Sequence, residues 1–310
     1  MIVKNNLSPL RIAQYARGPL SWAAAWSVAV PLAHSLTGWT WLMVPFAPVA
    51  AMIAALAIFV AFRNNASFAR WSEARAAWQT MLVACRVLAR QIVASADAAV
   101  AGGGVDRATA DEFVGPLVRR LIALMQLGAA QVPGRPNDDE WVHYLPESEV
   151  ATVRRSPDPV TRLLLAEGRQ IKGAIRAGVL GQFDPIAMEP QLAALNTAAG
   201  VTERIRSTPT PRQYDFFTRR FVELLAVVMP MGILSLIPGQ PVVTAVLSLL
   251  LSGMFIMMAV TGAANDEPFV GAVTDVPVLA LAREAERDLL DLLDVGTLPP
   301  PLAAVDGYLW

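Results

Sequence analysis

The stretch FVAFRNNASFARWSEARAAW, residues 59–78, passes from apolar to densely charged sequence without any helix breaker. Its first four residues are apolar. The charged residues that follow are Arg63, Arg70, Glu73 and Arg75. A helical pattern that meets no Gly or Pro has no local reason to stop. We therefore predict one helix that leaves an apolar environment and continues directly into a polar domain.

The composition indicates a membrane protein. The chain has 310 residues, of which 55% are hydrophobic and 16% charged, and its mean hydropathy is +0.44; soluble domains carry about 25% charged residues. Residues 19–62 contain no Asp, Glu, Lys or Arg, and neither do residues 224–264. Each run is about twice the roughly 20 residues that cross a bilayer as a helix. Each run is therefore expected to form a pair of spans.

A turn signal divides each apolar run near its middle. The first contains SLTGWTW around Gly38, and the second contains IPGQP, in which two prolines flank a glycine. The predicted spans are 19–36, 42–62, 221–237 and 241–263. The chain then divides into residues 1–62 with the first two spans, a polar domain over 63–220, residues 221–264 with the last two spans, and a polar C-terminal segment over 265–310.

Basic residues predict how the chain is oriented. They flank the inner ends of the predicted spans, whereas both outer turns are uncharged; the residues are Lys4, Arg11, Arg17, Arg63, Arg70, Arg75, Arg212, Arg219 and Arg220. By the positive-inside tendency, both termini and the polar domain lie in the cytoplasm. The expected location is the inner (plasma) membrane, crossed several times.

The polar segments read as helices. Apolar residues recur at helical spacing over 107–129 and 160–178, while 63–98 is rich in Ala, Arg, Leu and Gln, and 277–294 reads as an amphipathic helix. No segment shows the alternation of a strand ladder. The predicted fold class is an all-α membrane protein with four transmembrane helices and a large helical cytoplasmic domain.

Several classes of function are excluded by what the sequence lacks. The two histidines, His34 and His143, belong to no metalloprotease motif, and no nucleophile elbow or phosphate-binding loop is present. Cys85 is the only cysteine, so there is no intrachain disulfide and no thiolate metal cluster. No basic patch with interleaved aromatics suggests nucleic acid. We expect neither an enzyme nor a cofactor.

The second predicted span is unusually small-sided. Its alanines are Ala47, Ala50, Ala51, Ala54, Ala55, Ala57 and Ala61. Small residues let transmembrane helices approach closely, so this span is expected to be surrounded by protein. Ala54, Ile58 and Phe62 fall at i, i+4 and i+8 and form one face of it. From the residues alone, this face is either ordinary helix packing or a functional surface.

PFAPVAAMIAALAIFVAFRNNASFARWSEARAAW, residues 45–78, resembles the signature of the bestrophin family in its bacterial form. The matching residues after the span are Phe62, Arg63, Asn64, Ala66, Ser67, Arg70, Glu73, Ala74 and Arg75. Further matches follow in the same order: LPESEV (145–150), IRAGVL (175–180), STPTP (207–211) and EPFVGAVTDVPV (267–278). The resemblance therefore covers nearly the whole chain.

The resemblance implies a homopentamer with one central pore lined by the second span of each subunit. It implies a hydrophobic neck at Ala54, Ile58 and Phe62 and a narrow cytoplasmic aperture at Phe183. Ala54 is smaller than the residue usual there, and Phe183 is bulkier than the common aliphatic one. The residues expected to face neighbouring helices, as family motif and packing residues, are Arg63, Asn64, Ser67, Arg70, Glu73 and Arg75.

The resemblance also directs attention to a calcium clasp that animal members form around the segment corresponding to 264–275. Asp275 and Glu267 match ligand positions, but Ala264 and Ala272 occupy others. Calcium requires six or more oxygen ligands, so the loss of two weakens the site. We expect no metal site and no calcium dependence of opening.

The function that follows is a passive channel for small monovalent ions, and chloride or other anions are the expected permeant ions. A cation-selective channel of the same fold is the alternative within the class, because the neck face carries no fixed charge. A secondary transporter and a non-conducting membrane scaffold are alternatives from other classes. The expected partners are further copies of the chain, the lipid bilayer and the permeant ions.

Overall fold

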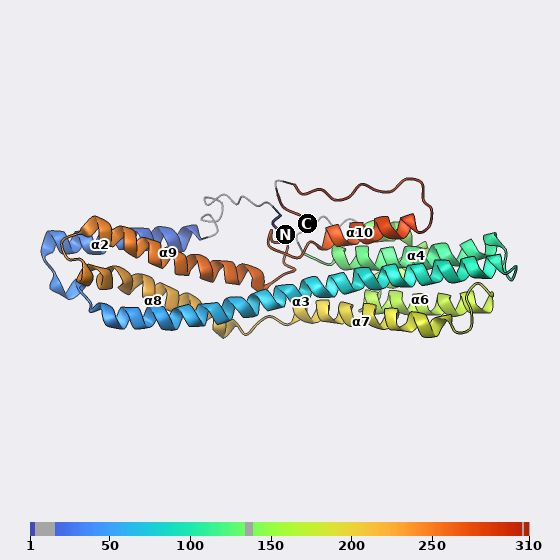
Figure 1. Ribbon diagram of the computed structural model, residues 1–310, viewed down its shortest axis with the longest axis horizontal. Helices are drawn as coiled ribbons and strands as arrows, with labels where there is room; N and C mark the ends of the chain where they lie inside the picture. Colours follow the sequence, from blue (N-terminus) through green and yellow to red (C-terminus); the bar gives the residue numbers. More distant parts are fainter. Residues whose placement is uncertain (4–15, 134–138, 306, 310) are drawn as a thin grey trace. The chain divides into compact units, whose positions relative to one another are not determined.

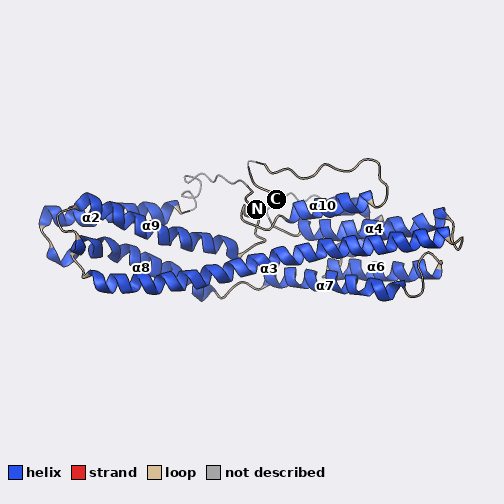
Figure 2. Cartoon of the chain, in the orientation of Figure 1, coloured by secondary structure: helices blue, strands red, loops and turns tan. Residues whose placement is uncertain are grey.

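The structure is a computed structural model that describes residues 1–3, 16–133, 139–305 and 307–309. Two of the basic residues used to predict orientation, Lys4 and Arg11, lie outside the described residues. Over the described ranges the chain is helical and contains no strand, only isolated bridges that pair Tyr308 with Ile2 and with Val305 (Figure 2). The all-helical prediction is confirmed.

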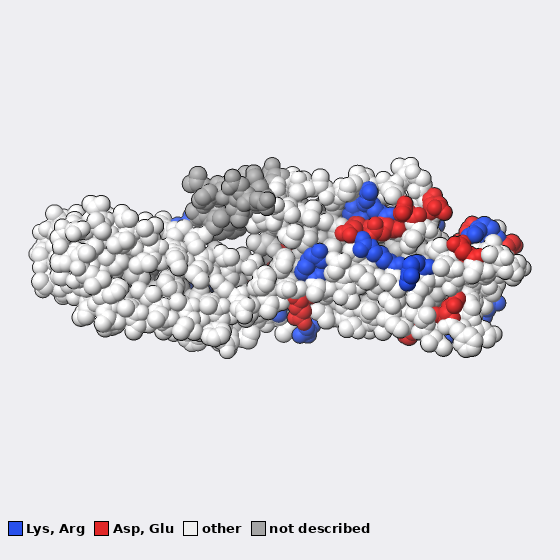
Figure 3. Space-filling model, in the orientation of Figure 1, with Lys and Arg blue, Asp and Glu red and all other residues white. Residues whose placement is uncertain are grey.

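The helices form two compact units. The apolar unit comprises residues 4–71 and 209–267, and the polar unit comprises residues 1–3, 72–208 and 268–310. The C-terminal segment thus groups with the middle of the chain. On the face shown in Figure 3, Lys, Arg, Asp and Glu gather over the polar unit and are nearly absent over the helices of the apolar unit.

Helix α3 (Phe46–Ala101) belongs to both units and is a single α-helix. Its continuity confirms the prediction made from residues 59–78. Between Val49 and Ala101 there is no Gly or Pro to interrupt it. It ends where three glycines follow, and the φ of Gly103 is +70°, a conformation that few other residues adopt.

The apolar unit packs α2 (Arg17–Thr37), α8 (Arg212–Leu236) and α9 (Pro241–Asp266) with the first part of α3 (Figure 1). Helix α2 ends at Gly38, whose φ is +71° and whose N–H donates to the carbonyl of His34. The short 3₁₀ helix η1 (Thr40–Leu42) leads from there toward α3. The second turn contains Gly239, with a φ of +83°, and Pro241 opens α9. Both predicted dividers are therefore turns.

The core of the apolar unit joins α3 to α8 and α9. Leu56 and Val60 of α3 are buried with Leu225, Met229 and Ile256. A Cβ added to Gly232 of α8 would lie 2.9 Å from Cγ2 of Val49, which is too close for any larger residue. Small residues at such contacts are how helices pack without a hydrophobic driving force between them.

Length and hydropathy alone select three of the described helical stretches as able to cross a membrane: Thr40–Ala101, Arg107–Ala130 and Pro241–Asp266. The first and last contain predicted spans. Helices α2 and α8 are not selected, so the count of four spans stays a prediction. Helix α4 (Arg107–Ala130) is selected, but Leu117, Leu121 and Leu124 are buried among helices of the polar unit. It is apolar because it is a core helix.

The polar unit packs α4, α6 (Pro159–Arg176), α7 (Asp184–Ser207) and α10 (Val278–Asp291) with the second part of α3, together with η2 (Asp139–Tyr144) and α5 (Glu147–Arg154). Asp106 and Asp158 cap α4 and α6 by accepting from the N–H groups of Thr109 and Thr161. The helices predicted over 107–129, 160–178 and 277–294 are confirmed, apart from a few residues at their ends. Helix α7 was not predicted.

The core of the polar unit contains charged groups as well as large aliphatic ones. Nε of Arg120 donates to Oε1 of Glu149 over 2.6 Å, and Nη1 of Arg120 donates to Oε2 of Glu167 over 2.9 Å. The Glu167 side chain is only 1% exposed. Burial raises the pKa of Glu167 to about 7, although Arg120 opposes the shift. Burial, with the nearby charge of Glu167, also raises the pKa of the Cys85 thiol.

Candidate functional site

The neck face, defined as Ala54, Ile58 and Phe62, lies on an uncovered side of α3. The Ile58 and Phe62 side chains are 60% and 71% exposed, whereas Leu56 and Val60 on the opposite side are buried. The structure therefore brings the three predicted residues onto one face that is exposed over most of its area. A bulky apolar face left open on a subunit requires lipid, another subunit or a pore beside it.

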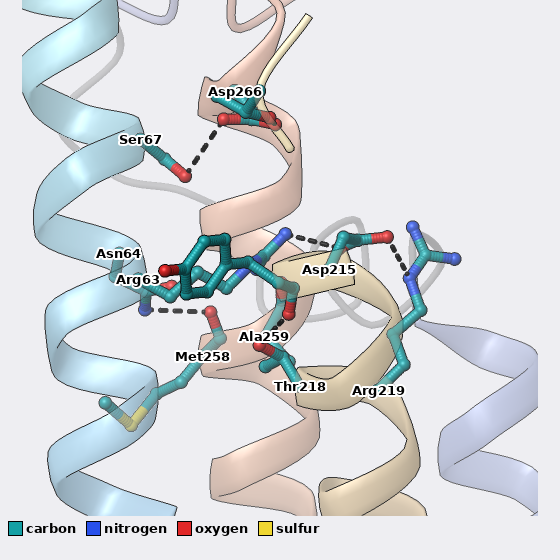
Figure 4. Close-up of polar contacts among 11 residues, drawn as sticks. Arg63, Asn64, Ser67, Asp215, Thr218, Arg219, Met258, Ala259 and Asp266 are labelled. Carbon is teal, nitrogen blue, oxygen red and sulfur yellow. Dashed lines mark hydrogen bonds and ion pairs between the residues drawn. The ribbon is translucent and has the colours of Figure 1, made fainter. Parts of the chain in front are cut away.

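Directly after Phe62, two polar side chains attach α3 to the backbone of α9 (Figure 4). Nη1 of Arg63 donates to the carbonyl of Ala259 over 2.9 Å, and Nδ2 of Asn64 donates to the carbonyl of Met258 over 3.0 Å. Arg63 is 8% exposed and also forms an ion pair with Asp215 of α8. Three helices are thus held together at the level where the apolar neck face ends.

Further along α3, Ser67 and Arg70 contact Asp266, the last residue of α9; Figure 4 shows the contact of Ser67. Oγ of Ser67 donates to Oδ1 of Asp266 over 3.3 Å, and Nε of Arg70 donates to the carbonyl of Asp266 over 2.9 Å. The hydroxyl of Thr210 donates to Oδ2 of Asp266. A cation beside the C-terminal end of a helix also stabilises its dipole.

Close approach of α3 and α9 depends on Gly262. A Cβ at this position would lie 1.9 Å from Oδ1 of Asn64 and 3.0 Å from Nη1 of Arg63. Non-bonded atoms do not approach to 1.9 Å. Asn64 and Arg63 therefore reach the α9 carbonyls only because residue 262 has no side chain.

The remaining motif residues on α3 lie in the polar unit. Oε1 of Glu73 lies 2.5 Å from Nη2 of Arg204 in an exposed ion pair. Nη1 of Arg75 donates to Oε1 of Gln79, one turn along the same helix, over 2.9 Å. These contacts are local or exposed, so each contributes little to stability.

Phe183 immediately precedes α7 and projects from its unit. Its side chain is 80% exposed, and Ile186, one turn later, is 71% exposed. The loop before it is held by Asp184, whose Oδ2 accepts from the N–H of Gly181 over 2.7 Å. The start of α7 thus presents two bulky apolar side chains, Phe183 and Ile186, to the exterior of the polar unit.

The clasp remnant divides between two environments. Asp275 is 1% exposed, and its Oδ2 accepts from the N–H of Gly271 over 2.7 Å, so this oxygen already closes a turn. Glu267 is exposed and follows α9. Within the described ranges, no group of three or more His, Cys, Asp or Glu side chains is arranged to hold a metal ion.

Sequence reasoning missed the partners of the motif. Asp215, Asp266 and the carbonyls of Met258 and Ala259 receive the bonds from α3, yet they lie about 150 to 200 residues away from it in sequence. Thr210, which also bonds to Asp266, lies in STPTP, one of the segments that carry the resemblance. A backbone carbonyl has no sequence signal.

These features define a class: an all-helical membrane protein in which one long helix leaves an apolar bundle and enters a polar one, with a bulky apolar face uncovered before the change. The model of a family described as bacterial/fungal bestrophin protein matches residues 11–291. This chain belongs to that family.

Individual relatives agree with this assignment. The chain is 29% identical, over 253 residues, to the voltage-dependent anion channel-forming protein YneE of Escherichia coli K12, covering 82% of this chain and 78% of that protein. It is 28% identical to the voltage-dependent anion channel-forming protein RSc3414 of Ralstonia nicotianae, covering 81% and 78%. The crystal structure of a variant of a bacterial bestrophin homologue from Klebsiella pneumoniae superposes with a TM-score of 0.78 at 26% identity, covering 90% of this chain and 98% of that one.

Proposed function

We propose that this chain is one subunit of a passive, homopentameric anion channel whose pore is lined by α3. The observation that carries the proposal is the uncovered neck face: Ile58 and Phe62 are more than half exposed on a helix whose other side is buried. A channel subunit requires such a face, since its pore lining is completed only by further copies. The channel lies in the inner membrane, with both termini in the cytoplasm.

The composition of α3 indicates that its first part is surrounded by protein rather than by lipid. The alanines around the neck face allow neighbouring copies of α3 to approach one another closely. The contacts of Arg63 and Asn64 then fix the height and rotation of the helix just beyond Phe62. A rigid support of this kind keeps an apolar constriction at a constant width.

The neck resists ions because it offers no polar partner. An ion that enters a ring of apolar side chains gives up part of its hydration, and a sufficiently narrow ring excludes water altogether. Ala54 leaves the outer end of the neck wide, so Ile58 and Phe62 form the barrier. A second constriction is formed by Phe183, whose exposed ring lies within the turn that Gly181 and Asp184 close.

Anions are the permeant class we propose. The named relatives are anion channel-forming proteins. The positive edge of an aromatic ring attracts anions, so rings of Phe62 whose edges face the axis would favour them. The face of the same ring attracts cations. Cation selectivity of the same channel is therefore the alternative that the experiment must separate.

The test is reconstitution of the purified chain in planar bilayers under a potassium chloride gradient. We expect unitary currents, with a reversal potential displaced toward that of chloride. Phe62→Ala and Ile58→Ala should each raise unitary conductance or open probability about twofold or more, because each removes part of the apolar barrier.

Phe68→Ala is the matched control. Phe68 is 56% exposed on the same helix but lies about 120° around it from Phe62. Its removal should leave conductance unchanged. An absence of unitary currents from the wild-type protein would reject the channel, and a reversal potential near that of potassium would reject anion selectivity. Equal currents from the wild type and both neck variants would show that Ile58 and Phe62 do not form the barrier.

A further inference from the structure

Asn64 and Asn65 are consecutive identical side chains with opposite environments. Nδ2 of Asn64 is bonded to the carbonyl of Met258, and its Oδ1 is enclosed beside Gly262. Asn65 is exposed, and within the described ranges no hydrogen bond or ion pair engages its carboxamide. The packing of the apolar unit accounts for the first asparagine and leaves the second without a structural role.

Helix geometry places Asn65 on the neck face. At about 100° per residue, its Cα direction differs from the mean direction of Ala54, Ile58 and Phe62 by about 20°. It follows Phe62 by three residues, which is about 4.5 Å along the helix axis. Ala69, the next exposed residue in this direction, is apolar. Asn65 is thus the first polar side chain on this face after the three neck residues.

The carboxamide suits the exit of an apolar constriction. It carries two N–H donors and one carbonyl acceptor and has no net charge. An anion that leaves a dry ring regains ligands most readily from N–H donors, and an uncharged donor holds the anion too weakly to block its release. Conduction requires this combination of favourable entry and easy departure.

We propose that Asn65 is a specificity-determining residue: in the assembled channel its carboxamides form a ring that donates N–H groups to the permeant anion as the anion leaves the Phe62 constriction. This inference rests on the proposed function. It adds a polar ligand to a pathway otherwise described by apolar residues.

The test measures reversal potentials and unitary conductance in bilayers for Asn65→Asp, Asn65→Lys and Asn65→Leu. We expect Asn65→Asp to lower the chloride-to-potassium permeability ratio about threefold or more, and Asn65→Lys to raise it, because rings of fixed charge control selectivity. Asn65→Leu, which keeps the size and removes the polar groups, should lower conductance about twofold. Gln213→Glu is the control, since Gln213 is an exposed carboxamide of the same unit on α8.

A second measurement tests the proposal even if the charged variants at position 65 fail to assemble. Cys85 is buried, so Asn65→Cys would supply the exposed thiol of the described chain. A negatively charged methanethiosulfonate reagent should change the currents of Asn65→Cys and leave those of the wild type unaltered.

The outcomes separate the two proposals. A wild-type protein without currents rejects the channel itself. If Phe62→Ala changes conductance while the Asn65 variants keep wild-type selectivity and conductance, the role proposed for the neck residues is supported and the role proposed for Asn65 is wrong. The role of Asn65 is also wrong if the reagent leaves the currents of Asn65→Cys unchanged. A shift in Gln213→Glu equal to that in Asn65→Asp also overturns it, because the effect would then be one of surface charge.

Discussion

Among the residues that the structure describes, each unit buries one arginine, and the polar groups of the two arginines find different partners. Arg63 in the apolar unit donates to a backbone carbonyl of α9 and pairs with Asp215 at the end of the bundle. Arg120 in the polar unit lies between the carboxylates of Glu149 and Glu167 in the interior. The apolar unit therefore keeps charge at its edge, whereas the polar unit has charge in its core.

The two units also differ in the size of the side chains at their helix contacts. The apolar unit relies on glycines at helix contacts, with Gly232 against Val49 and Gly262 against Asn64. The polar unit fills its core with large side chains such as Trp78, Leu121 and Leu163. In water the burial of large apolar groups stabilises a bundle by itself, whereas in lipid close contact and hydrogen bonding must do so. Three substitutions test this contrast.

The largest effect is expected from Arg120→Leu. Removal of the guanidinium leaves Glu149 and Glu167 together without a counter-charge, which should destabilise the polar unit by about 3–5 kcal/mol. The readout is the Tm of the detergent-purified protein. Arg119→Leu is the control, because the neighbouring Arg119 is exposed and its loss should change stability by about 0.5 kcal/mol or less. Equal Tm values for the two variants would show that buried Arg120 contributes no more to stability than exposed Arg119.

Glu167→Gln tests the pH dependence of the same cluster. The folded-state pKa of Glu167, about 7, exceeds the ordinary value of 4.5, so on raising the pH the unfolded chain loses this proton first. Stability from this group is fully present below pH 4.5 and is lost as the pH rises through 7, by at most about 3 kcal/mol. The wild-type Tm should therefore fall more between pH 5 and pH 8 than that of Glu167→Gln.

The control for the pH experiment is Glu112→Gln, which removes an exposed carboxylate from α4. Its Tm should follow the wild-type pH profile. If Glu167→Gln also follows that profile, the carboxyl does not retain its proton in the folded state.

Gly262→Ala should have the smallest effect of the three and tests the apolar unit. The added Cβ displaces Asn64 from the carbonyl of Met258, and overpacking with loss of this bond should destabilise the unit by about 2 kcal/mol. In Gly253→Ala, also on α9, the new Cβ would lie 3.6 Å from the nearest atom, Cδ2 of Leu20. That control should be neutral or slightly stabilised, since alanine favours helix. A tolerated Gly262→Ala would mean that α3 and α9 do not need this close approach.

Local patterns predicted most of the fold. The absence of Gly and Pro from residues 59–78 predicted that one helix continues from apolar into polar sequence, and α3 is continuous there. Gly38 and the Pro-Gly turn near 239 predicted where the apolar runs divide. Helix α7 escaped prediction, and helix α4 satisfies the hydropathy test for a membrane span while serving as a core helix. Periodicity reports which residues are apolar, but it does not report what surrounds them.

The all-helical class, the change from apolar to polar along α3, and the common face of Ala54, Ile58 and Phe62 could all be predicted from the residues in order. These properties follow from covalent geometry and residue spacing within one helix. The contacts of Asn64, the exposure of Asn65, and the bonds of Arg63 to Ala259 and Asp215 became visible only in the folded chain. Those pairings join segments far apart in the chain, and they depend on how closely α3, α8 and α9 approach, which no local pattern encodes.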